Sequence, residues 1–290
     1  MSENNLLHRL PKVLLVLALL ALFLYVLVLI AIWWKQENLL FAPTILAQTH
    51  SFKVGADVQE KFIEVEGARL SVLHLRLPKP KAVVLFLHGN GGSLDNWFVN
   101  TDFYRSMNVD LMMIDYRGYG KSSGSITSEQ QLHKDVAQAF KFLKLEYSDL
   151  PVVLLGRSLG TGLASHLYAS VPLPLRPKLL ILVSPFSSLK ELAAAHFTFV
   201  PSALLRYTMR SDLALAGLNR DPNAAGKPSS NVLLVHGDQD PLIPIQHSQR
   251  LAALQPEFKL KVIEGGAHND LQDFPSYLDA IRQGVAVAIP

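Results

Sequence analysis

The sequence predicts an α/β fold in which a mostly parallel, eight-stranded sheet is flanked by helices and carries a small cap, behind one N-terminal transmembrane helix. Three observations lead to this prediction. An uncharged apolar stretch lies near the N-terminus, short runs of Val, Leu and Ile alternate with amphipathic stretches farther along, and one run ends at Gly156-x-Ser158-x-Gly160 and continues with helical spacing. At 290 residues and 49% hydrophobic content, the chain can build the core of one moderate-sized domain.

The apolar stretch, residues 13–34, reads VLLVLALLALFLYVLVLIAIWW. As a helix at about 1.5 Å per residue it would reach roughly 33 Å, enough to cross a hydrocarbon core of about 30 Å. A cleaved signal peptide has a shorter apolar region, and no small-x-small cleavage site follows this one, so we expect an uncleaved signal anchor. Trp33 and Trp34 lie at the end of the stretch, where aromatic side chains are enriched at the level of the lipid headgroups. Lys12 and Lys35 lie directly before and after the stretch.

The charges on either side of this stretch predict its orientation. Arg9 and Lys12 precede it, whereas Lys35 follows and is partly offset by Glu37. Because cytoplasmic flanks are enriched in basic residues, we expect a cytoplasmic N-terminus and a catalytic domain on the non-cytoplasmic side. The predicted segments are residues 1–12 as the N-terminal flank, 13–34 as the transmembrane helix, 35–60 as a juxtamembrane connector and 61–290 as the folded domain.

The predicted sheet begins with an antiparallel hairpin and continues with parallel strands. FIEV and LSVLHLRL, joined around Glu66-Gly67, form the hairpin. The later runs are continuous in Leu and β-branched residues, which is typical of strands buried on both faces. They are Val83–Leu87, Leu111–Asp115, Val152–Gly156, Leu179–Ser184, Val232–His236 and Leu260–Ile263.

Helices and one insertion fill the intervals between these runs. The clearest helix runs from Ser128 to Lys144, where Ser128 and Gln131 could form a capping box. A similar spacing of Leu and Phe recurs from Leu271 to Ile281. The segment at about 186–230, rich in Phe and Leu, interrupts the alternation and is predicted to be a cap whose PNAAGKP end forms a loop.

Composition excludes several classes of function. The 27 Lys and Arg residues exceed the 24 Asp and Glu residues by only three, which is too weak a charge to indicate nucleic-acid binding. The absence of cysteine excludes disulfides, thiolate metal sites and a cysteine nucleophile. With no pair of metal ligands at i,i+4 spacing on a predicted helix, we expect no metal and no cofactor. The oligomeric state stays open.

A strand that ends in Gly-x-Ser-x-Gly and passes directly into a helix predicts a nucleophile elbow. Gly156 and Gly160 have no side chains that could clash in the tight turn. Ser158 is therefore expected to be exposed, with a strained backbone. A hydroxyl is a poor nucleophile without a base, and the amide of Leu159 at the helix start can face a developing oxyanion. An ordinary glycine-rich turn is the alternative, since matches of five residues are common by chance.

Two further residues in the required chain order favour the catalytic interpretation. VLLVHGDQDPLIP places Asp240 beyond one strand, and KVIEGGAHND places His268 beyond the next. Asp238 competes with Asp240, which we favour because it lies farther out in the loop. The sequence therefore predicts a catalytic triad of Ser158, Asp240 and His268, each at the carboxyl end of a strand.

The loop after the first parallel strand supplies a second oxyanion donor. VVLFLHGNGG ends in a glycine-rich loop, and we assign the donor to the amide of Asn90. A phosphate-binding loop is the alternative, but no Gly-Lys-Ser/Thr follows at the Walker spacing. We expect His88 and His236 to brace loops rather than to catalyse.

These motifs together resemble the α/β-hydrolase superfamily, and within it the membrane-anchored serine hydrolases akin to the fungal bud-emergence hydrolases. The resemblance covers most of the chain from Leu39 and is carried by HGNGG, DYRGYGKSSG, GRSLG, SPFSSL, HGDQDPLIP and GAHND, in the family's order. It implies the same triad and a structural role for Asp115, Tyr116 and Arg117. The segment from Asp212 to Ser230 is longer than usual in the family, and Gly91 stands where relatives often carry Ala.

The resemblance implies acyl esters, thioesters or lysophospholipids as substrates, without choosing among them. Phe and Leu side chains in the cap and the tether to a membrane favour an acyl ester, with the bilayer and the substrate as the expected partners. Packing of those side chains as the cap's own core is the alternative. A membrane-bound serine peptidase and a non-catalytic scaffold with a retained hydrolase fold are the rival functions.

Overall fold

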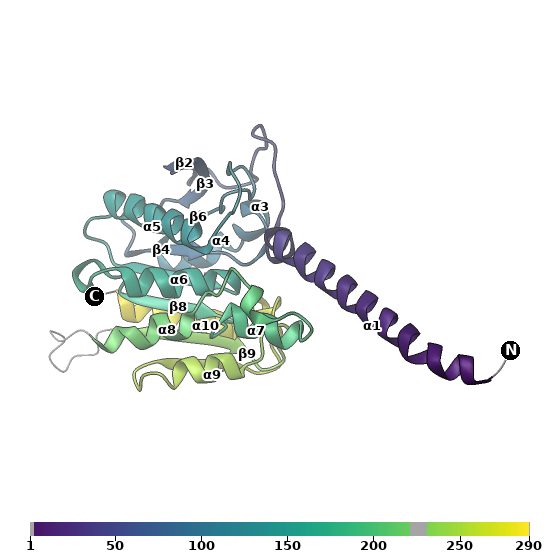
Figure 1. The fold of residues 1–290 in the computed structure, drawn as a ribbon. Helices are drawn as coiled ribbons and strands as arrows, with labels where there is room; N and C mark the ends of the chain where they lie inside the picture. Colours follow the sequence, from purple (N-terminus) through teal and green to yellow (C-terminus); the bar gives the residue numbers. More distant parts are fainter. Residues whose placement is uncertain (1–2, 221–230, 290) are drawn as a thin grey trace.

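The computed structural model describes residues 3–220 and 231–289, and it contains the predicted mixed sheet (Figure 1). Eight strands lie in the order β10-β9-β8-β7-β4-β6-β3-β2, and among them only β3 runs antiparallel to its neighbours, β2 and β6. The strands are β2 Val58–Val65, β3 Ala68–Leu75, β4 Ala82–Leu87, β6 Val109–Ile114, β7 Val152–Arg157, β8 Leu179–Val183, β9 Val232–Gly237 and β10 Lys259–Ile263. The fold class predicted from the sequence is confirmed.

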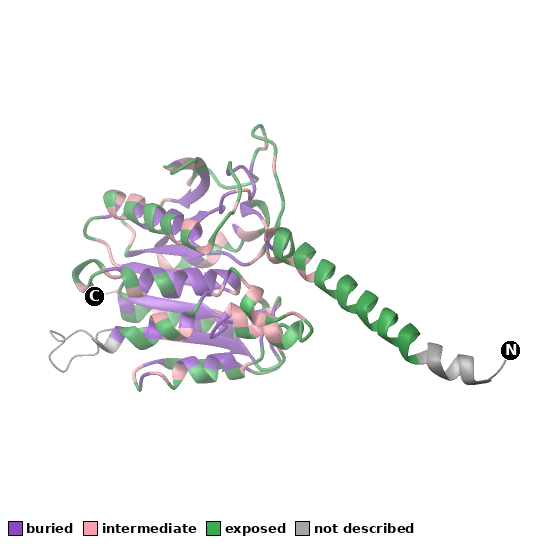
Figure 2. Ribbon diagram, in the orientation of Figure 1, coloured by how far each residue is buried: buried purple, intermediate pink, exposed green. Residues whose placement is uncertain are grey.

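Helices cover both faces of the sheet because the central strands are apolar on both sides. In β7, Val152 and Leu154 pack into one core cluster, whereas Val153 and Leu155 pack into the other. Helices α5 Glu129–Glu146, α6 Leu159–Ser170, α8 Ser211–Ala216 and α9 Gln246–Ala252 cover the first face. Helices α3 Leu94–Trp97, α4 Thr101–Met107 and α10 Pro275–Ala288 cover the second. Figure 2 shows the sheet between them as buried.

Helix α1, Glu3–Trp34, projects away from the domain (Figure 1) and includes the predicted span. Its segment Pro11–Trp34 is long and apolar enough to cross a membrane, and its side chains are almost all exposed (Figure 2). The connector that follows is more structured than the sequence suggests. It contains α2 Gln36–Leu40 and the short strand β1 Ala42–Pro43, and β2 begins at Val58, before residue 61 where the sequence predicts the domain to start.

Two helix starts differ from the sequence prediction. At α5, the Ser128 hydroxyl accepts from the amide of Gln131 at 3.1 Å, but the Gln131 side chain accepts from the amide of Thr127 at 2.9 Å instead of that of Ser128. Only half of the capping box forms, because the side chain reaches one residue farther back. At the C-terminus, Leu271 lies in the 3₁₀ turn η4 Leu271–Asp273 and α10 starts at Pro275, since the residue before a proline is held extended.

The segment predicted as a cap contains several short helices. After β8 come α7 Leu189–His196, the 3₁₀ turn η2 Ser202–Leu204, α8 and the 3₁₀ turn η3 Gly217–Arg220. Helix α8 packs against α6 and α9, and thus belongs to the body of the domain. The predicted PNAAGKP loop lies outside the described residues. A further 3₁₀ turn, η1 Leu173–Leu175, links α6 to β8.

A buried ion pair joins the loop after β6 to α5. Arg117 donates to both carboxylate oxygens of Asp135 at 2.6 and 2.7 Å, and both side chains are almost fully buried. Arg117 also donates to the carbonyl of Glu66 at 3.1 Å in the β2–β3 turn. The arginine of the DYRGYG motif therefore has the structural role that the family resemblance implies.

Replacement of Asp135 by Ala should lower the free energy of unfolding by about 3–5 kcal/mol, because it leaves the Arg117 guanidinium buried without a counter-charge. Urea unfolding in detergent, followed by near-ultraviolet circular dichroism, measures the change. Lys134→Ala is the matched control, since Lys134 forms only an exposed pair with Glu66 at 3.7 Å and should change stability by less than about 1 kcal/mol. Equal losses in the two variants would contradict the assignment.

Candidate active site

Ser158 lies at a sharp bend between β7 and α6, as the Gly-x-Ser-x-Gly pattern predicts. Its backbone adopts φ +51° and ψ −118°, a conformation that costs energy for a residue with a side chain. The flanking glycines permit the bend by allowing close backbone approach. A Cβ on Gly160 would lie 2.0 Å from the carbonyl oxygen of Leu87 in β4, and one on Gly156 would lie 2.5 Å from the carbonyl oxygen of Gly160.

The structure brings together the three predicted triad residues. His268 Nε2 lies 3.0 Å from Ser158 Oγ, and His268 Nδ1 lies 2.7 Å from Asp240 Oδ2. A carboxylate only accepts hydrogen bonds, so Nδ1 carries the proton and Nε2 is the acceptor for the serine hydroxyl. Asp238, the competing carboxylate, points elsewhere and accepts from the amide of Gly265 at 2.8 Å. Asp240 is thus the aspartate that orients the imidazole.

Asp240 is held in place by its own loop. Its Oδ1 accepts from the amides of Leu242 and Ile243, both at 2.9 Å. Burial alone would raise the pKa of Asp240, but hydrogen bonds from His236 and His268 and from the Ile243 amide outweigh it and lower that pKa well below its usual range. A carboxylate with a lowered pKa stabilises the folded chain above its unfolded pKa, and this stability is lost only as the pH falls through the folded value.

His236 braces this loop, as the sequence predicts. It is fully buried at the end of β9, and its Nδ1 lies 2.6 Å from Ser248 Oγ. Its Nε2 lies 2.8 Å from the carbonyl oxygen of Ile243 and 3.4 Å from Asp240 Oδ2. A proton on His236 Nε2 therefore faces both the Ile243 carbonyl and the Asp240 carboxylate. His236 thus holds these two parts of the loop together.

The two residues predicted as oxyanion donors border one cavity with Ser158. Leu159 is the first residue of α6, and Asn90 lies in the glycine-rich loop after β4. The end of that loop, β5 Gly91–Gly92, pairs in parallel with β1, the strand that follows the N-terminal helices. Thr44 continues the pairing by donating to the carbonyl of Gly92 at 2.8 Å. The connector thus supports the loop that carries Asn90.

Two tyrosines of the DYRGYG motif also hold this loop. Tyr116 donates to the carbonyl of His88 at 2.8 Å, and Tyr119 donates to the carbonyl of Asn90 at 2.7 Å. His88 is fully buried, and its Nδ1 lies 2.7 Å from the carbonyl of Gly89, as expected for a loop-bracing histidine. These contacts fix the backbone of the loop that carries Asn90.

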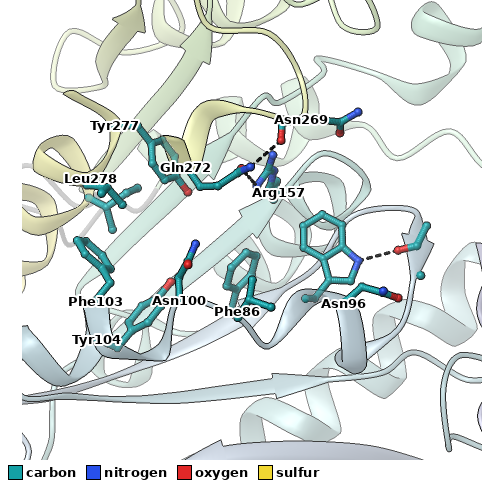
Figure 3. Close-up of a pocket in the computed structure, with 15 residues that line it drawn as sticks. Phe86, Asn96, Asn100, Phe103, Tyr104, Arg157, Asn269, Gln272, Tyr277 and Leu278 are labelled. Carbon is teal, nitrogen blue, oxygen red and sulfur yellow. Dashed lines mark hydrogen bonds between the residues drawn. The ribbon is translucent and has the colours of Figure 1, made fainter. Parts of the chain in front are cut away.

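Arg157 is a residue of the site that the sequence reasoning missed. It directly precedes Ser158 and donates to the carbonyl of His268 at 3.0 Å. It also donates to Gln272 Oε1 at 2.9 Å (Figure 3). Its guanidinium also lies 5.5 Å from the ring centroid of Trp97. It ties the loop of the histidine to the strand of the nucleophile. The available signal was a charged residue at the end of an otherwise apolar strand.

Ser158 opens into a mostly apolar cavity of about 670 Å³. None of its lining residues, all within the described part of the chain, is acidic. Besides Ser158, Leu159, Asn90 and His268, the lining includes Leu39 and Leu40 of the connector, Leu189, Leu192, His196 and Phe197 of α7 and its end, and Leu242 and Ile243. Among the described residues of the predicted cap segment, those that border the site therefore come from its first part.

A second pocket of about 430 Å³ lies next to this cavity but does not contain Ser158 (Figure 3). The two share Gly91, Trp97 and Asn269, so the Trp97 side chain stands between them. The second pocket is lined by aromatic residues and by amides such as Asn96, Asn100 and Gln272. Because a reacting carbonyl must reach Ser158 Oγ, the larger cavity is the one that can hold the acyl group.

Comparisons with known proteins identify a matching family and similar sequences. The family model described as serine aminopeptidase, S33, matches residues 78–225. Lysophosphatidylserine lipase ABHD12 of Macaca fascicularis is 30% identical over 213 residues, 67% of this chain and 52% of the relative. The chain spans about half the length of the first curated relatives that it matches.

Solved structures share the fold. An esterase of Pyrococcus furiosus, Pf2001, superposes with a TM-score of 0.64 at 17% identity, covering 84% of this chain and 98% of the esterase. A soluble variant of the monoglyceride lipase of Saccharomyces cerevisiae, in complex with a substrate analogue, gives 0.61 at 15% identity, covering 84% and 99%. At these identities the likeness concerns the fold alone.

Asp240→Asn should lower kcat for a short acyl ester by about 10⁴-fold while leaving the fold intact, because an amide can present its N–H to Nδ1 and favour the wrong tautomer of His268. Steady-state kinetics with the detergent-solubilised chain measure the loss. Asp238→Asn is the matched control: its side chain keeps an oxygen for the Gly265 amide and does not contact His268. A larger loss for Asp238→Asn than for Asp240→Asn would overturn the assignment.

Proposed function

Because the chain belongs to the serine aminopeptidase S33 family of the α/β-hydrolase superfamily, we propose that it is a membrane-anchored lipid esterase that cleaves acyl esters through a covalent acyl-Ser158. It is a serine hydrolase of the carboxylic-ester class. The observation that carries the proposal is the unbroken chain of hydrogen bonds from Asp240 through His268 to Ser158 at the floor of an apolar cavity.

In the first half-reaction, Ser158 Oγ attacks the ester carbonyl carbon while its proton passes to His268 Nε2. The carbonyl oxygen becomes an oxyanion held by the amides of Leu159 and Asn90. As this intermediate collapses, the bond to the alcohol breaks, and the alcohol leaves with the proton from Nε2. Asp240 stabilises the imidazolium that exists between these two proton transfers.

In the second half-reaction, water attacks the acyl-Ser158 carbonyl and gives its proton to His268 Nε2. The second oxyanion forms between the same two amides. When it collapses, the carboxylic acid leaves and the Ser158 hydroxyl regains its proton from Nε2. The three side chains end as they began, so the cycle needs no further reactant.

The cavity supports an acyl chain as the group bound beside Ser158. Its walls carry the side chains of Leu189, Leu192 and Phe197 from the cap and Leu39 from the connector. Apolar walls with few polar groups at one end are typical of sites that bind a hydrocarbon and orient one reactive bond. The lysophosphatidylserine lipase named above acts on a lysophospholipid by its name, and we extend the class of single-chain lipids to this chain.

A peptide is the less favoured substrate, although the family description names aminopeptidases. An aminopeptidase must bind a free ammonium group, and a carboxylate is the usual partner for such a charge. No Asp or Glu is among the residues that line the described cavity. A non-catalytic scaffold is also disfavoured, because such a protein has no need for a strained backbone at Ser158 or for the aligned imidazole.

The proposed anchor is α1, with the domain on the non-cytoplasmic side. Arg9 and Lys12 before the span outnumber Lys35 after it, and Glu37 beside Lys35 forms an ion pair with Arg206 of the cap at 2.6 Å. The basic flank therefore favours a cytoplasmic N-terminus. This places the proposed activity next to lipid, in keeping with a role in lipid metabolism.

A fluorophosphonate probe should label the detergent-solubilised chain at Ser158, because the probe reacts only with a serine activated by a base. Ser158→Ala should abolish both labelling and ester hydrolysis. Ser170→Ala, at the exposed end of the same helix, should label as the parent does. In-gel fluorescence and mass spectrometry measure the result. Parental hydrolysis by Ser158→Ala would end the proposal.

Activity should rise with acyl length until the cavity is filled. Each buried methylene is worth about 0.8 kcal/mol, so kcat/KM should rise by at most about fourfold per carbon in a series of p-nitrophenyl esters. Leu192→Ser should flatten the series without changing acetyl-ester hydrolysis, whereas Leu145→Ser on the exposed face of α5 should leave it unchanged. A flat series in the parent, or faster cleavage of aminoacyl anilides, would contradict the proposed substrate class.

A further inference from the structure

One face of α1 contacts the cap well inside the apolar stretch. Tyr25, Leu29, Ile32 and Gln36 recur at steps of four, three and four residues, the spacing of one helix face. Leu29 and Ile32 are half-buried, and Gln36, which follows the end of α1, is buried, whereas their neighbours around the helix are mostly exposed. This face therefore packs on the domain, while the remaining apolar side chains of α1 stay free to contact lipid.

Hydrogen bonds fix the cap along this face. Gln36 donates to the carbonyl of Leu204 at 3.0 Å and accepts from the amide of Arg206 at 2.7 Å. Farther up the helix, the Tyr25 hydroxyl donates to the carbonyl of Phe199 at 2.8 Å. The cap chain from Arg206 back to Phe199 thus runs beside α1 from its C-terminal end toward its middle.

Charged and aromatic contacts add to the packing between the cap and the C-terminal end of α1. Arg206 pairs with Glu37 at 2.6 Å and donates to the carbonyl of Trp33 at 3.1 Å, and its guanidinium lies 5.2 Å from the Trp33 ring centroid. Tyr207 donates to the other Glu37 oxygen at 2.7 Å. These polar groups lie at the end of the apolar stretch, where the headgroup region is expected.

The hydrogen bond between Tyr25 of α1 and Phe199 of the cap indicates how deep Phe199 would lie in a membrane that α1 spans. Tyr25 lies nine residues before Trp34, or about 14 Å along the helix axis. If Trp33 and Trp34 mark the headgroup level, a backbone carbonyl bonded to Tyr25 lies at the level of the acyl chains. The side chains of Phe197 and Phe199 are 54% and 55% exposed, so the domain leaves both of them largely uncovered.

We propose that the cap segment Phe197–Val200 inserts into the same membrane leaflet that α1 enters, so that the mouth of the Ser158 cavity opens directly onto lipid. The inference rests on the proposed function in two respects: the identity of the substrate and the role of α1 as the membrane span. Three exposed apolar side chains from separate segments rim the cavity, Leu39, Phe197 and Leu242. A single-chain lipid can then slide its tail into the cavity without crossing water.

Lipid is the occupant favoured over a protein partner because the apolar segment is continuous with the spanning helix. Because the Phe199 carbonyl is hydrogen-bonded to Tyr25 within the candidate span, the segment Phe197–Val200 would lie in the bilayer that surrounds the span. The Phe199 carbonyl, which would be costly to bury unpaired in hydrocarbon, is satisfied by the Tyr25 hydroxyl. This hydrogen bond meets, for the Phe199 carbonyl, the requirement that backbone polar groups in the hydrocarbon region be paired.

The chain contains no cysteine, so single labels can be placed without background. Phe199→Cys, carrying a bimane fluorophore, is reconstituted in phosphatidylcholine vesicles that contain dibrominated acyl chains. Its fluorescence should fall as far as that of Leu22→Cys, an exposed position within the span, while Leu145→Cys on the domain surface should lose none. A label at position 199 that behaves like the one at position 145 would overturn the proposal.

A second measurement tests the consequence for access. Phe199 does not line the cavity, so Phe199→Ser should leave hydrolysis of a soluble butyrate ester unchanged. Hydrolysis of a monoacylglycerol presented in vesicles should fall by about tenfold, from the loss of an apolar side chain in the leaflet. Equal rates on vesicles for the parent and Phe199→Ser would refute the access route. If neither substrate is cleaved by the parent, the proposed function fails, whereas the quenching result still decides the position of the segment.

Discussion

The backbone bend at Ser158 depends on the close approach of α6 to β4, where Gly160 lies against the carbonyl of Leu87. Any side chain at that glycine would force the helix away from the sheet and flatten the bend. The strained backbone at Ser158 is in turn stabilised by the amide of Ser158 bonding to the carbonyl of Val183 in β8 at 2.9 Å. The nucleophile is therefore presented by three neighbouring strands acting together.

The remaining parts of the site converge because parallel strands end at one edge of the sheet. The loops after strands β4, β7, β9 and β10 bring the glycine-rich loop, Ser158, Asp240 and His268 to that edge. Contacts between loops then set the alignment. Arg157 bonds to the carbonyl of His268, and His236 holds the loop of Asp240. These two side chains orient Asp240 and His268, and neither of them lines the cavity of Ser158.

The N-terminal segment contacts the site as well as carrying the candidate membrane span. Its short strand β1 pairs with the glycine-rich loop, its Leu39 and Leu40 line the cavity, and Gln36 satisfies the cap backbone. Helix α2, the connector and the cap thus form one structural unit around the cavity of Ser158. Leu39 and Leu40, which precede the first strand of the main sheet, complete the wall of this cavity.

The sequence by itself determined the fold and predicted the proposed triad of Ser158, Asp240 and His268, because strand periodicity, the Gly-x-Ser-x-Gly turn and the chain order of these residues are patterns that can be read locally. It could not decide which distant segments touch. The contact of Arg157 with the histidine loop, the pairing of β1 with the loop of Asn90 and the packing of Tyr25 against Phe199 join residues far apart in the chain. Such contacts arise only when packing of the whole domain brings their backbones together, so only the tertiary structure decided them.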